Sequence, residues 1–292
     1  MMLDRVAPTP LRAVPGPALP VEALVLGRPV AEAAALLPRL FNLCRAAQGV
    51  AAALALDLPP PTADIGAEIR RDHLLKLFVQ LPGRFGRGDA PPALTGDAGT
   101  IRAALFGPAA AAPTTTAETD AFLASGHGLA PLLGRIAGCF GQGVACANGL
   151  PLAGPDTGTP AAENSPAARR AAHPALAHVE ATHGRGPLWR VFGRALDLDA
   201  VLSGDLPAPR LLRPGTAQVP ATRGLYTVTA TQAGGLVTGV SRLTPTDHLL
   251  APGGILALSL ATLPADRAGL APLLLDILDP CSPVRLAEVA DA

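Results

Sequence analysis

The sequence predicts a soluble globular protein that combines α-helices with a β-hairpin. Hydrophobic residues make up 49% of its 292 residues, which is enough for one large core or two smaller ones. Apolar residues recur at helical spacing in several segments, the first of them at 40–54. Two stretches, 225–231 and 236–243, alternate as strands do and flank a glycine-rich turn at 233–235, so they predict a hairpin.

The composition excludes several classes of partner. The formal net charge is zero, so nothing predicts a general attraction to nucleic acid or to an anionic membrane. The first residues lack the apolar run of a signal peptide, and no apolar stretch reaches the roughly 20 residues of a membrane-spanning helix. Four cysteines do not make a disulfide framework in a chain of this length. We therefore expect a reduced, cytoplasmic protein without membrane insertion.

The first part of the chain is expected to be extended and then helical. Residues 7–20 are rich in proline and are expected to run over the surface, and 21–26 are expected to form a short strand. A helix should begin near Val30, and Pro38 either kinks it or opens a second one. Cys44 falls on the apolar side of this second helical pattern, where it is either a buried structural thiol or a ligand.

A further helix is predicted over 64–81. Ile69, His73 and Leu77 share one face of it at intervals of four residues. Asp72 and His73 therefore form an ionisable pair placed partly among apolar side chains. Such a histidine serves either as a satisfied core or interface residue or as a ligand.

The pattern weakens from residue 83 to about 166, which predicts loops with short helices at 119–125 and 129–140. Cys139 and Cys146 are expected to be small buried hydrophobic residues. No Cys-x-x-Cys occurs in the sequence, so neither a zinc ribbon nor a thioredoxin-type site is supported.

Helices are also expected at 167–179 and 189–198. His173, His178 and His183 recur at intervals of five residues. On a helix, residues five positions apart are rotated by about 140° from each other, so these histidines do not share a face. A metal site would require an irregular segment there, because helical zinc pairs use intervals of three or four.

The predicted hairpin is followed by an amphipathic helix at 265–278. Asp279 and Pro280 end this helix, because proline disfavours helical geometry in the residue before it. Cys281 is thereby delivered to a fixed point just beyond a helix end. The common phosphate-loop, dinucleotide and nucleophile-elbow motifs are absent, so the residues alone give no independent evidence for an enzyme.

Four segments follow one another in an order that resembles the large subunit of nickel–iron hydrogenases. They are 43–48 with Cys44, 69–78 with Asp72 and His73, 223–246 with Arg223 and Thr246, and 278–281 with Cys281. The resemblance covers about half of the chain. It implies a mainly α-helical protein with a small antiparallel sheet, an α+β fold that is a reduced form of the large subunit. The whole chain, 1–292, would be a single domain in which 21–82 and 210–292 pack together and the middle is rich in loops.

The chain departs from that family at three positions. Hydrogenase large subunits hold nickel and an iron with cyanide and carbon monoxide ligands between two cysteine pairs. Here the second cysteine of each pair falls on Ala47 and Val284, and the histidine that ends the mature subunit falls on Ala287. Loss of both bridging thiolates removes the binuclear site, since soft metals there need anionic sulfur. We therefore expect neither hydrogenase catalysis nor maturation cleavage.

These departures are similar to those of the hydrogenase expression/formation proteins of the HupK (HoxV) type, which are shortened relatives of the large subunit. The resemblance implies a non-catalytic scaffold or metallochaperone for nickel–iron hydrogenase maturation. It would hold the Fe(CN)2CO unit, or its precursor, for the hydrogenase large subunit, with other maturation proteins as further partners. Iron is the expected metal, ahead of nickel.

The same resemblance implies the roles of six residues. They are Cys44 and Cys281 as metal ligands in a buried cleft, Arg223 and Thr246 as hydrogen-bond donors to the iron-bound ligands, and His73 and Asp72 as supporting groups or part of a transfer surface. Two alternatives stay open. One is a degenerate, nickel-binding hydrogenase with residual activity, and the other is a metal-free folding decoy that binds hydrogenase subunits.

Overall fold

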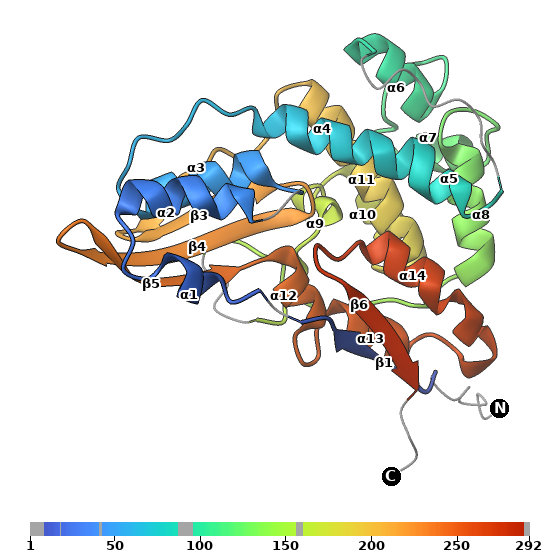
Figure 1. Ribbon diagram of the computed structural model, residues 1–292. Coiled ribbons are helices and arrows are strands. Elements are labelled where there is room, and N and C mark those ends of the chain that lie inside the picture. Colours follow the sequence, from blue (N-terminus) through green and yellow to red (C-terminus); the bar gives the residue numbers. More distant parts are fainter. Residues whose placement is uncertain (1–8, 18, 41–42, 87–95, 156–159, 289–292) are drawn as a thin grey trace.

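The computed structural model describes residues 9–17, 19–40, 43–86, 96–155 and 160–288 (Figure 1). It contains helices and two antiparallel sheets, one of four strands in the order β2-β3-β4-β5 and one of two strands, β1 and β6. The predicted α+β class is therefore confirmed. The start of the proline-rich stretch lies outside the described residues. Of the helices in these ranges, none combines the length and apolar character that crossing a membrane requires.

Helix is more abundant than strand in the described residues. The α-helices are α1 (Val21–Val25), α2 (Val30–Leu36), α3 (Arg45–Ala55), α4 (Ile65–Leu75), α5 (Leu81–Gly83), α6 (Ala98–Phe106), α7 (Thr116–Leu123), α8 (Ala130–Phe140), α9 (Pro166–Arg169), α10 (Pro174–His183), α11 (Pro187–Leu202), α12 (Pro245–Leu250), α13 (Ile255–Ala261) and α14 (Ala271–Leu278). Two 3₁₀-helices are η1 (Leu37–Arg39) and η3 (Ala265–Leu270), and η2 (Lys76–Gln80) is a π-helix. The strands are β1 (Leu11–Pro15), β2 (Arg210–Arg213), β3 (Thr216–Ala221), β4 (Gly224–Ala233), β5 (Leu236–Leu243) and β6 (Val284–Glu288).

Two predictions for the first part of the chain are wrong. The expected strand at 21–26 is the helix α1, because Val21 and Val25 lie one helical turn apart and are both buried as α1 packs on β5. Such packing outweighs the strand preference of valine. Cys44 does not lie within a helix, since α3 begins at Arg45 and Cys44 is its N-cap residue with non-helical backbone angles. The helix at Val30 is confirmed.

The helix predicted at 64–81 is confirmed as α4, η2 and α5 in continuous succession. Asp64 caps its start, and its carboxylate accepts a hydrogen bond from the Ala67 N–H. The helices at 129–140 and 189–198 are confirmed as α8 and α11. The helix predicted at 167–179 is instead divided into α9 and α10, since Pro174 keeps the preceding residue out of helical geometry.

The predicted hairpin is confirmed as β4 and β5, and their partners β2 and β3 complete the larger sheet. The last helix is divided into η3 and α14, and it ends as predicted before Pro280. Asp279 closes it in the left-handed conformation, with φ of 55° and ψ of 59°. Helices α6, α12 and α13 and strands β2, β3 and β6 were not predicted, because each is too short to show a clear period.

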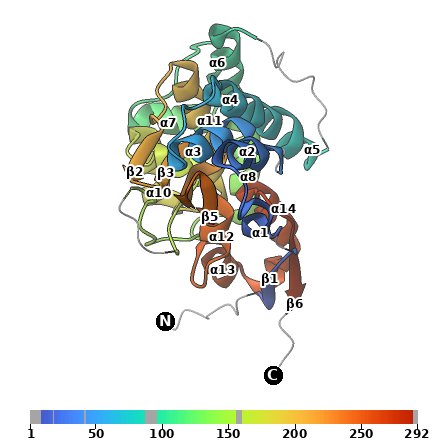
Figure 2. The same ribbon diagram turned by 60° about the vertical axis from the view of Figure 1, so that its left-hand side comes forward.

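The two ends of the chain lie close together in the fold. Helices α2 and α3 lie along the four-stranded sheet, and α3 contacts both β3 and β4 (Figure 1). Both views place β1 beside β6, in antiparallel register from Leu11 opposite Glu288 to Pro15 opposite Val284 (Figure 2). One hydrophobic core lies between α3 and the sheet, and a second one surrounds α11, whose Trp189 and Phe192 are fully buried. The candidate site forms where these elements meet.

Replacement of Gly224 by alanine should destabilise the turn between β3 and β4. Gly224 has a φ of 147°, and a Cβ there would lie 2.2 Å from the Asn164 Oδ1. We expect a loss of about 2 kcal/mol or more in the free energy of unfolding, measured with urea. Gly138→Ala is the matched control, because nothing lies within 4 Å of its added Cβ on α8. The control should gain up to about 1 kcal/mol, and equal stability of the two variants would contradict the packing described here.

Candidate metal centre

Cys44 and Cys281 lie side by side although 236 residues separate them in the sequence. Each thiol is the largest single influence on the pKa of the other. The Cys44 sulfur also lies 3.0 Å from the Thr222 hydroxyl, and the Cys281 N–H donates a 2.7 Å hydrogen bond to the Thr246 hydroxyl. Cys44 is buried and Cys281 is partly buried. The structure therefore brings the two sequence-predicted metal ligands together at one place.

Two different helix ends hold the cysteines. Cys281 follows α14, where the left-handed Asp279 and the ring of Pro280 turn the chain back toward the sheet. Cys44 precedes α3 but gives no side-chain cap to it. Glu68 of α4 caps α3 instead, since its carboxylate accepts hydrogen bonds from the N–H groups of Ala46 at 3.0 Å and Ala47 at 3.4 Å. Burial raises the pKa of Glu68 despite these hydrogen bonds.

The two thiols differ in acidity. The hydrogen bond from Cys44, together with the charge of Arg223, lowers the pKa of Cys281 to about 7 against the effect of burial. The hydrogen bond to Cys281 and burial raise the pKa of the Cys44 thiol far above its usual range. Cys281 is therefore the more acidic thiol of the pair, and Cys44 is the less acidic one. A metal that binds both sulfurs must displace the Cys44 proton.

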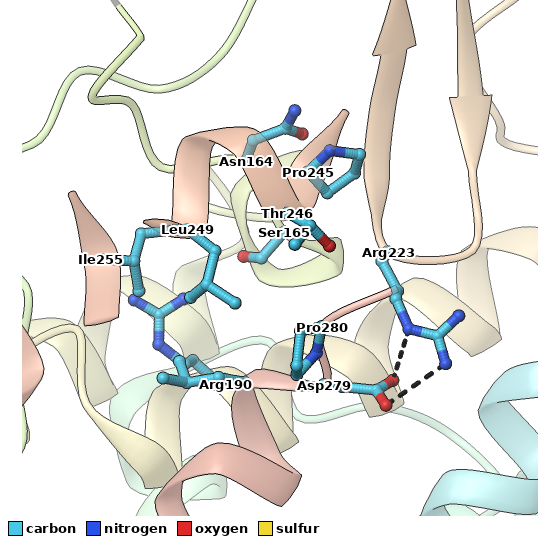
Figure 3. Close-up of a pocket in the computed structure, with 11 residues that line it drawn as sticks. Asn164, Ser165, Arg190, Arg223, Pro245, Thr246, Leu249, Ile255, Asp279 and Pro280 are labelled. Atoms are coloured by element: carbon cyan, nitrogen blue, oxygen red, sulfur yellow. Dashed lines mark hydrogen bonds and ion pairs between the residues drawn. The ribbon is translucent and has the colours of Figure 1, made fainter. Parts of the chain in front are cut away.

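Arg223 extends from the turn between β3 and β4 and is buried beside the cysteines. Its Nε and Nη2 lie 3.0 and 3.2 Å from the two carboxylate oxygens of Asp279 (Figure 3). Nη2 is also 3.5 Å from the Asp72 Oδ1, and Nη1 donates to the Thr222 hydroxyl at 3.2 Å. The guanidinium is thus oriented by fixed partners on one side while its charge acts on both thiols.

Two further buried cations complete this group. Arg194 of α11 bridges the carboxylates, with Nη1 3.3 Å from Asp72 and Nη2 3.0 Å from Asp279. The Lys76 Nζ lies 2.9 Å from the Asp279 Oδ1. Burial alone would raise the pKa of Asp72 and Asp279. The neighbouring His73 together with Arg223 and Arg194 holds the pKa of Asp72 below its usual range, and the charges of Arg194, Arg223 and Lys76 do the same for Asp279. We call Asp72, Asp279 and the three cations the charge cluster.

His73 is next to the charge cluster and does not contact the two thiols. Its Nε2 is 2.9 Å from the Asp197 Oδ2, and both side chains are fully buried. Asp197 in turn accepts a 3.0 Å hydrogen bond from Arg169. Arg169 also donates 2.9 Å hydrogen bonds to the carbonyls of Ala221 and Gly224. These carbonyls flank the turn that carries Arg223, so His73 takes part in fixing that turn.

Thr246 and Arg223 line a small cavity next to the cysteine-bearing tail (Figure 3). The cavity holds about 20 Å³, which is room for one molecule of the size of water. Its wall is completed by Asn164, Ser165, Arg190, Pro245, Leu249, Ile255, Leu278, Asp279 and Pro280. The cavity combines several polar side chains with apolar ones, which suits a very small ligand.

The other cysteines and histidines do not join this site. Cys146 is buried and its thiol donates to backbone carbonyls, as expected for a structural cysteine, whereas Cys139 is only partly buried. His173 caps α10, His178 pairs with Asp120 at 2.7 Å, and His183 contacts Thr182. In the part of the chain that the structure describes, no three His, Cys, Asp or Glu side chains are grouped so that they could hold a metal.

Five residues of the site were missed by sequence reasoning: Lys76, Glu68, Arg169, Arg194 and Asp197. A signal existed for some of them. Lys76 lies four residues after Asp72, on the same helical face. Arg190, Arg194 and Asp197 recur at helical spacing among the buried residues of α11, where charged residues are buried only when they are paired.

No family model matches the chain. Among curated proteins, the hydrogenase expression/formation protein HupK of Rhodobacter capsulatus is 50% identical to it over 276 residues, which is 94% of this chain and 92% of the relative. The chain belongs to the HupK family. The similarity to this family that the cysteine-bearing segments predicted is thereby confirmed, and it extends through the middle of the chain as well.

The acidity of Cys281 can be measured directly in this HupK-family chain. The rate of alkylation of Cys281 by iodoacetamide, followed by peptide mass spectrometry, should reach half of its maximum near pH 7. In Cys44→Ala this midpoint should rise, because the strongest stabilisation of the thiolate is lost. Cys146, whose pKa is raised by burial, serves as the internal control. An unchanged midpoint in Cys44→Ala would show that the thiols do not interact.

Acid should weaken the charge cluster. Since the folded-state pKa of Asp72 is lowered, its stabilising contribution is present above the unfolded pKa of about 3.9 and is lost as the pH falls through the folded-state value. Asp72→Asn should cost about 2 kcal/mol of unfolding free energy at pH 7, and the difference from wild type should shrink below about pH 4.

Urea unfolding at a series of pH values measures this dependence. Asp57→Asn, at an exposed turn residue with a φ of 58°, is the control that should leave the profile unchanged. A constant difference between wild type and Asp72→Asn down to pH 3 would refute the predicted linkage.

Proposed function

We propose that this HupK-family chain is a non-catalytic accessory protein of nickel–iron hydrogenase maturation, acting in the cytoplasm as a scaffold. It holds the Fe(CN)2CO unit, or the precursor of that unit, before the hydrogenase large subunit receives it. The relative at 50% identity carries the name of a hydrogenase expression/formation protein, which supports the accessory role. The scaffold role goes further and depends on the site.

One observation carries the scaffold proposal: the thiols of Cys44 and Cys281 meet beside the buried Arg223. Two thiolates are suitable ligands for a soft or borderline metal. The guanidinium of Arg223 is a strong donor for the anionic nitrogen of an iron-bound cyanide. The hydroxyl of Thr246, next to Cys281, can donate a second hydrogen bond into the small cavity.

The ligand set suits temporary holding. Ala47 lies in the first turn of α3, where its N–H faces Glu68, and Val284 lies in β6 opposite Pro15. Neither offers a thiolate, and no further ligand is grouped with the cysteines among the residues that the structure describes. Because two ligands bind a metal less tightly than four, the cargo can be released to a partner that offers more sulfur.

We also propose a reduced large-subunit-like fold with one domain for 1–292. The packing of α3 on β3 and β4 supports it, since these contacts join 21–82 to 210–292. The pairing of β1 with β6 also attaches residues 11–15 to the C-terminal part. A scaffold with the shape of its recipient could present the cargo to the same maturation proteins. The hydrogenase large subunit and those proteins are therefore the proposed partners.

Infrared spectra of the protein purified without oxygen from hydrogenase-producing cells test this function. Wild type should show cyanide and carbonyl bands, and Cys44→Ser and Cys281→Ser should lose them together with most of the hydrogenase maturation. Cys139→Ser is the control, because Cys139 lies on α8 away from the site.

Other outcomes would select the alternatives. Full maturation with a double cysteine variant, and no bands in wild type, would indicate a metal-free folding decoy. Bound nickel with hydrogen-dependent dye reduction would indicate a degenerate hydrogenase.

A further inference from the structure

Lys76 and Arg194 give the charge cluster an excess of positive charge. The cluster contains three cations, Lys76, Arg194 and Arg223, and two carboxylates, Asp72 and Asp279, all joined by contacts of 2.9 to 3.5 Å. The cationic side chains are less than a tenth exposed. Charges removed from water in this way act strongly on their neighbours, because little solvent screens them.

We infer that Lys76 and Arg194 determine the specificity of the cysteine site: they make it accept iron that already carries anionic ligands and reject a bare divalent cation. This inference rests on the proposed function and adds to it the residues that select the form of the cargo. Neither residue contacts the cysteines directly. Both act through Asp279, which leads into the tail with Cys281.

The supply of donor atoms leads to the same conclusion. Divalent zinc and iron bind in proteins with four or more donors, yet only two thiols are available here among the residues that the structure describes. The nearest carboxylates cannot add to them. Asp279 is taken up by Lys76, Arg194 and Arg223, and Asp72 by the two arginines. The site therefore suits a metal that keeps strong ligands of its own better than one that needs four protein donors.

The Cys281 thiolate offsets part of this excess until it binds a metal, and the other surrounding charges are paired among themselves. Behind His73, the carboxylates of Asp197 and Asp205 are matched by Arg169 and Arg170. Glu68 is the other carboxylate near Asp72. It is hydrogen-bonded to the first N–H groups of α3, where the positive end of the helix dipole balances its charge.

Lys76 is also the single lysine of the chain. It belongs to the π-helical turn η2, a helix distortion that is frequent at functional sites. Its Nζ donates a second hydrogen bond to the carbonyl of Asp276 at 3.1 Å. It thus lies at the inner wall of a surface pocket that Arg84 and Asp276 also line. Lys76 is buried, has two polar partners and belongs to a distorted helical turn. Its ammonium group therefore supplies a positive charge at a fixed position.

An in vitro comparison of two iron sources tests the inference. The probes are ferrous sulfate and an anionic iron(II) dicyanide carbonyl bromide complex, each added to the full-length protein without oxygen. In the second case the Fe–Br bond breaks, bromide leaves with its electron pair, and the Cys281 thiolate forms an Fe–S bond. A second Fe–S bond forms when carbon monoxide leaves and Cys44 gives its proton to the solvent. No change of oxidation state is involved.

Wild type should bind the complex at least about tenfold more tightly than the bare ion. Lys76→Gln and Arg194→Gln should each weaken the complex about tenfold and strengthen bare iron binding, while Lys76→Arg should keep the wild-type preference. Infrared bands of the protein after gel filtration report the complex, and iron analysis reports the bare ion. Circular dichroism checks that each variant is folded.

Each result has a distinct meaning. Equal binding of the two iron sources by wild type, which needs no variant, would overturn the inference but leave the scaffold function standing. Equal affinity of the complex for wild type and for a folded Lys76→Gln or Arg194→Gln would do the same. Failure of wild type to retain any cyanide band from the complex would overturn both the inference and the proposed function.

Discussion

The carboxylate of Asp279 is the feature on which the site depends. It is buried, in a left-handed backbone conformation, and three cations contact it from α11, from the turn after β3 and from η2. An uncompensated buried carboxylate is very costly, so these elements can take their observed places only together. Because Asp279 is two residues before Cys281, this network also fixes where one of the two thiols lies.

A second buried network fixes the opposite side. His73, Asp197 and Arg169 connect α4, α11 and α9 to the carbonyls that flank the turn of Arg223. The close approach of Gly224 to Asn164 requires a residue without a side chain at that turn. Hydrogen bonds to charged groups are stronger and more directional than neutral ones, so two such networks meeting at Arg223 produce a preorganised donor.

The resulting site is asymmetric. Cys44 and Arg223 lower the pKa of Cys281, whereas burial and Cys281 raise the pKa of Cys44, which has Thr222 as a further partner. Glu68 occupies the start of α3, where a free helix end would otherwise stabilise a Cys44 thiolate. In such a site one thiol ionises readily and the other must lose its proton before it binds a metal. Uptake and release of a metal are then easier than in a site whose ligands are all ionised.

Local signals in the sequence determined much of the fold. The hairpin, the long helices and their ends were predictable because proline, glycine and apolar spacing act within a few residues. The two cysteines and their family pattern were visible in the same way. Residues 21–26, however, formed a helix because of burial against β5, which no local pattern contains.

Only the tertiary structure decided which charges surround the cysteines. Lys76, Arg194 and Asp279 come from segments far apart in the sequence, and their pairing depends on how α4, α11 and α14 pack. The sequence by itself determined that two thiols were present and two were missing. Their protonation and the positive charge around them arise from burial and from long-range contacts, because the strength of an electrostatic interaction depends on distance and solvent exposure, which are properties of the folded chain.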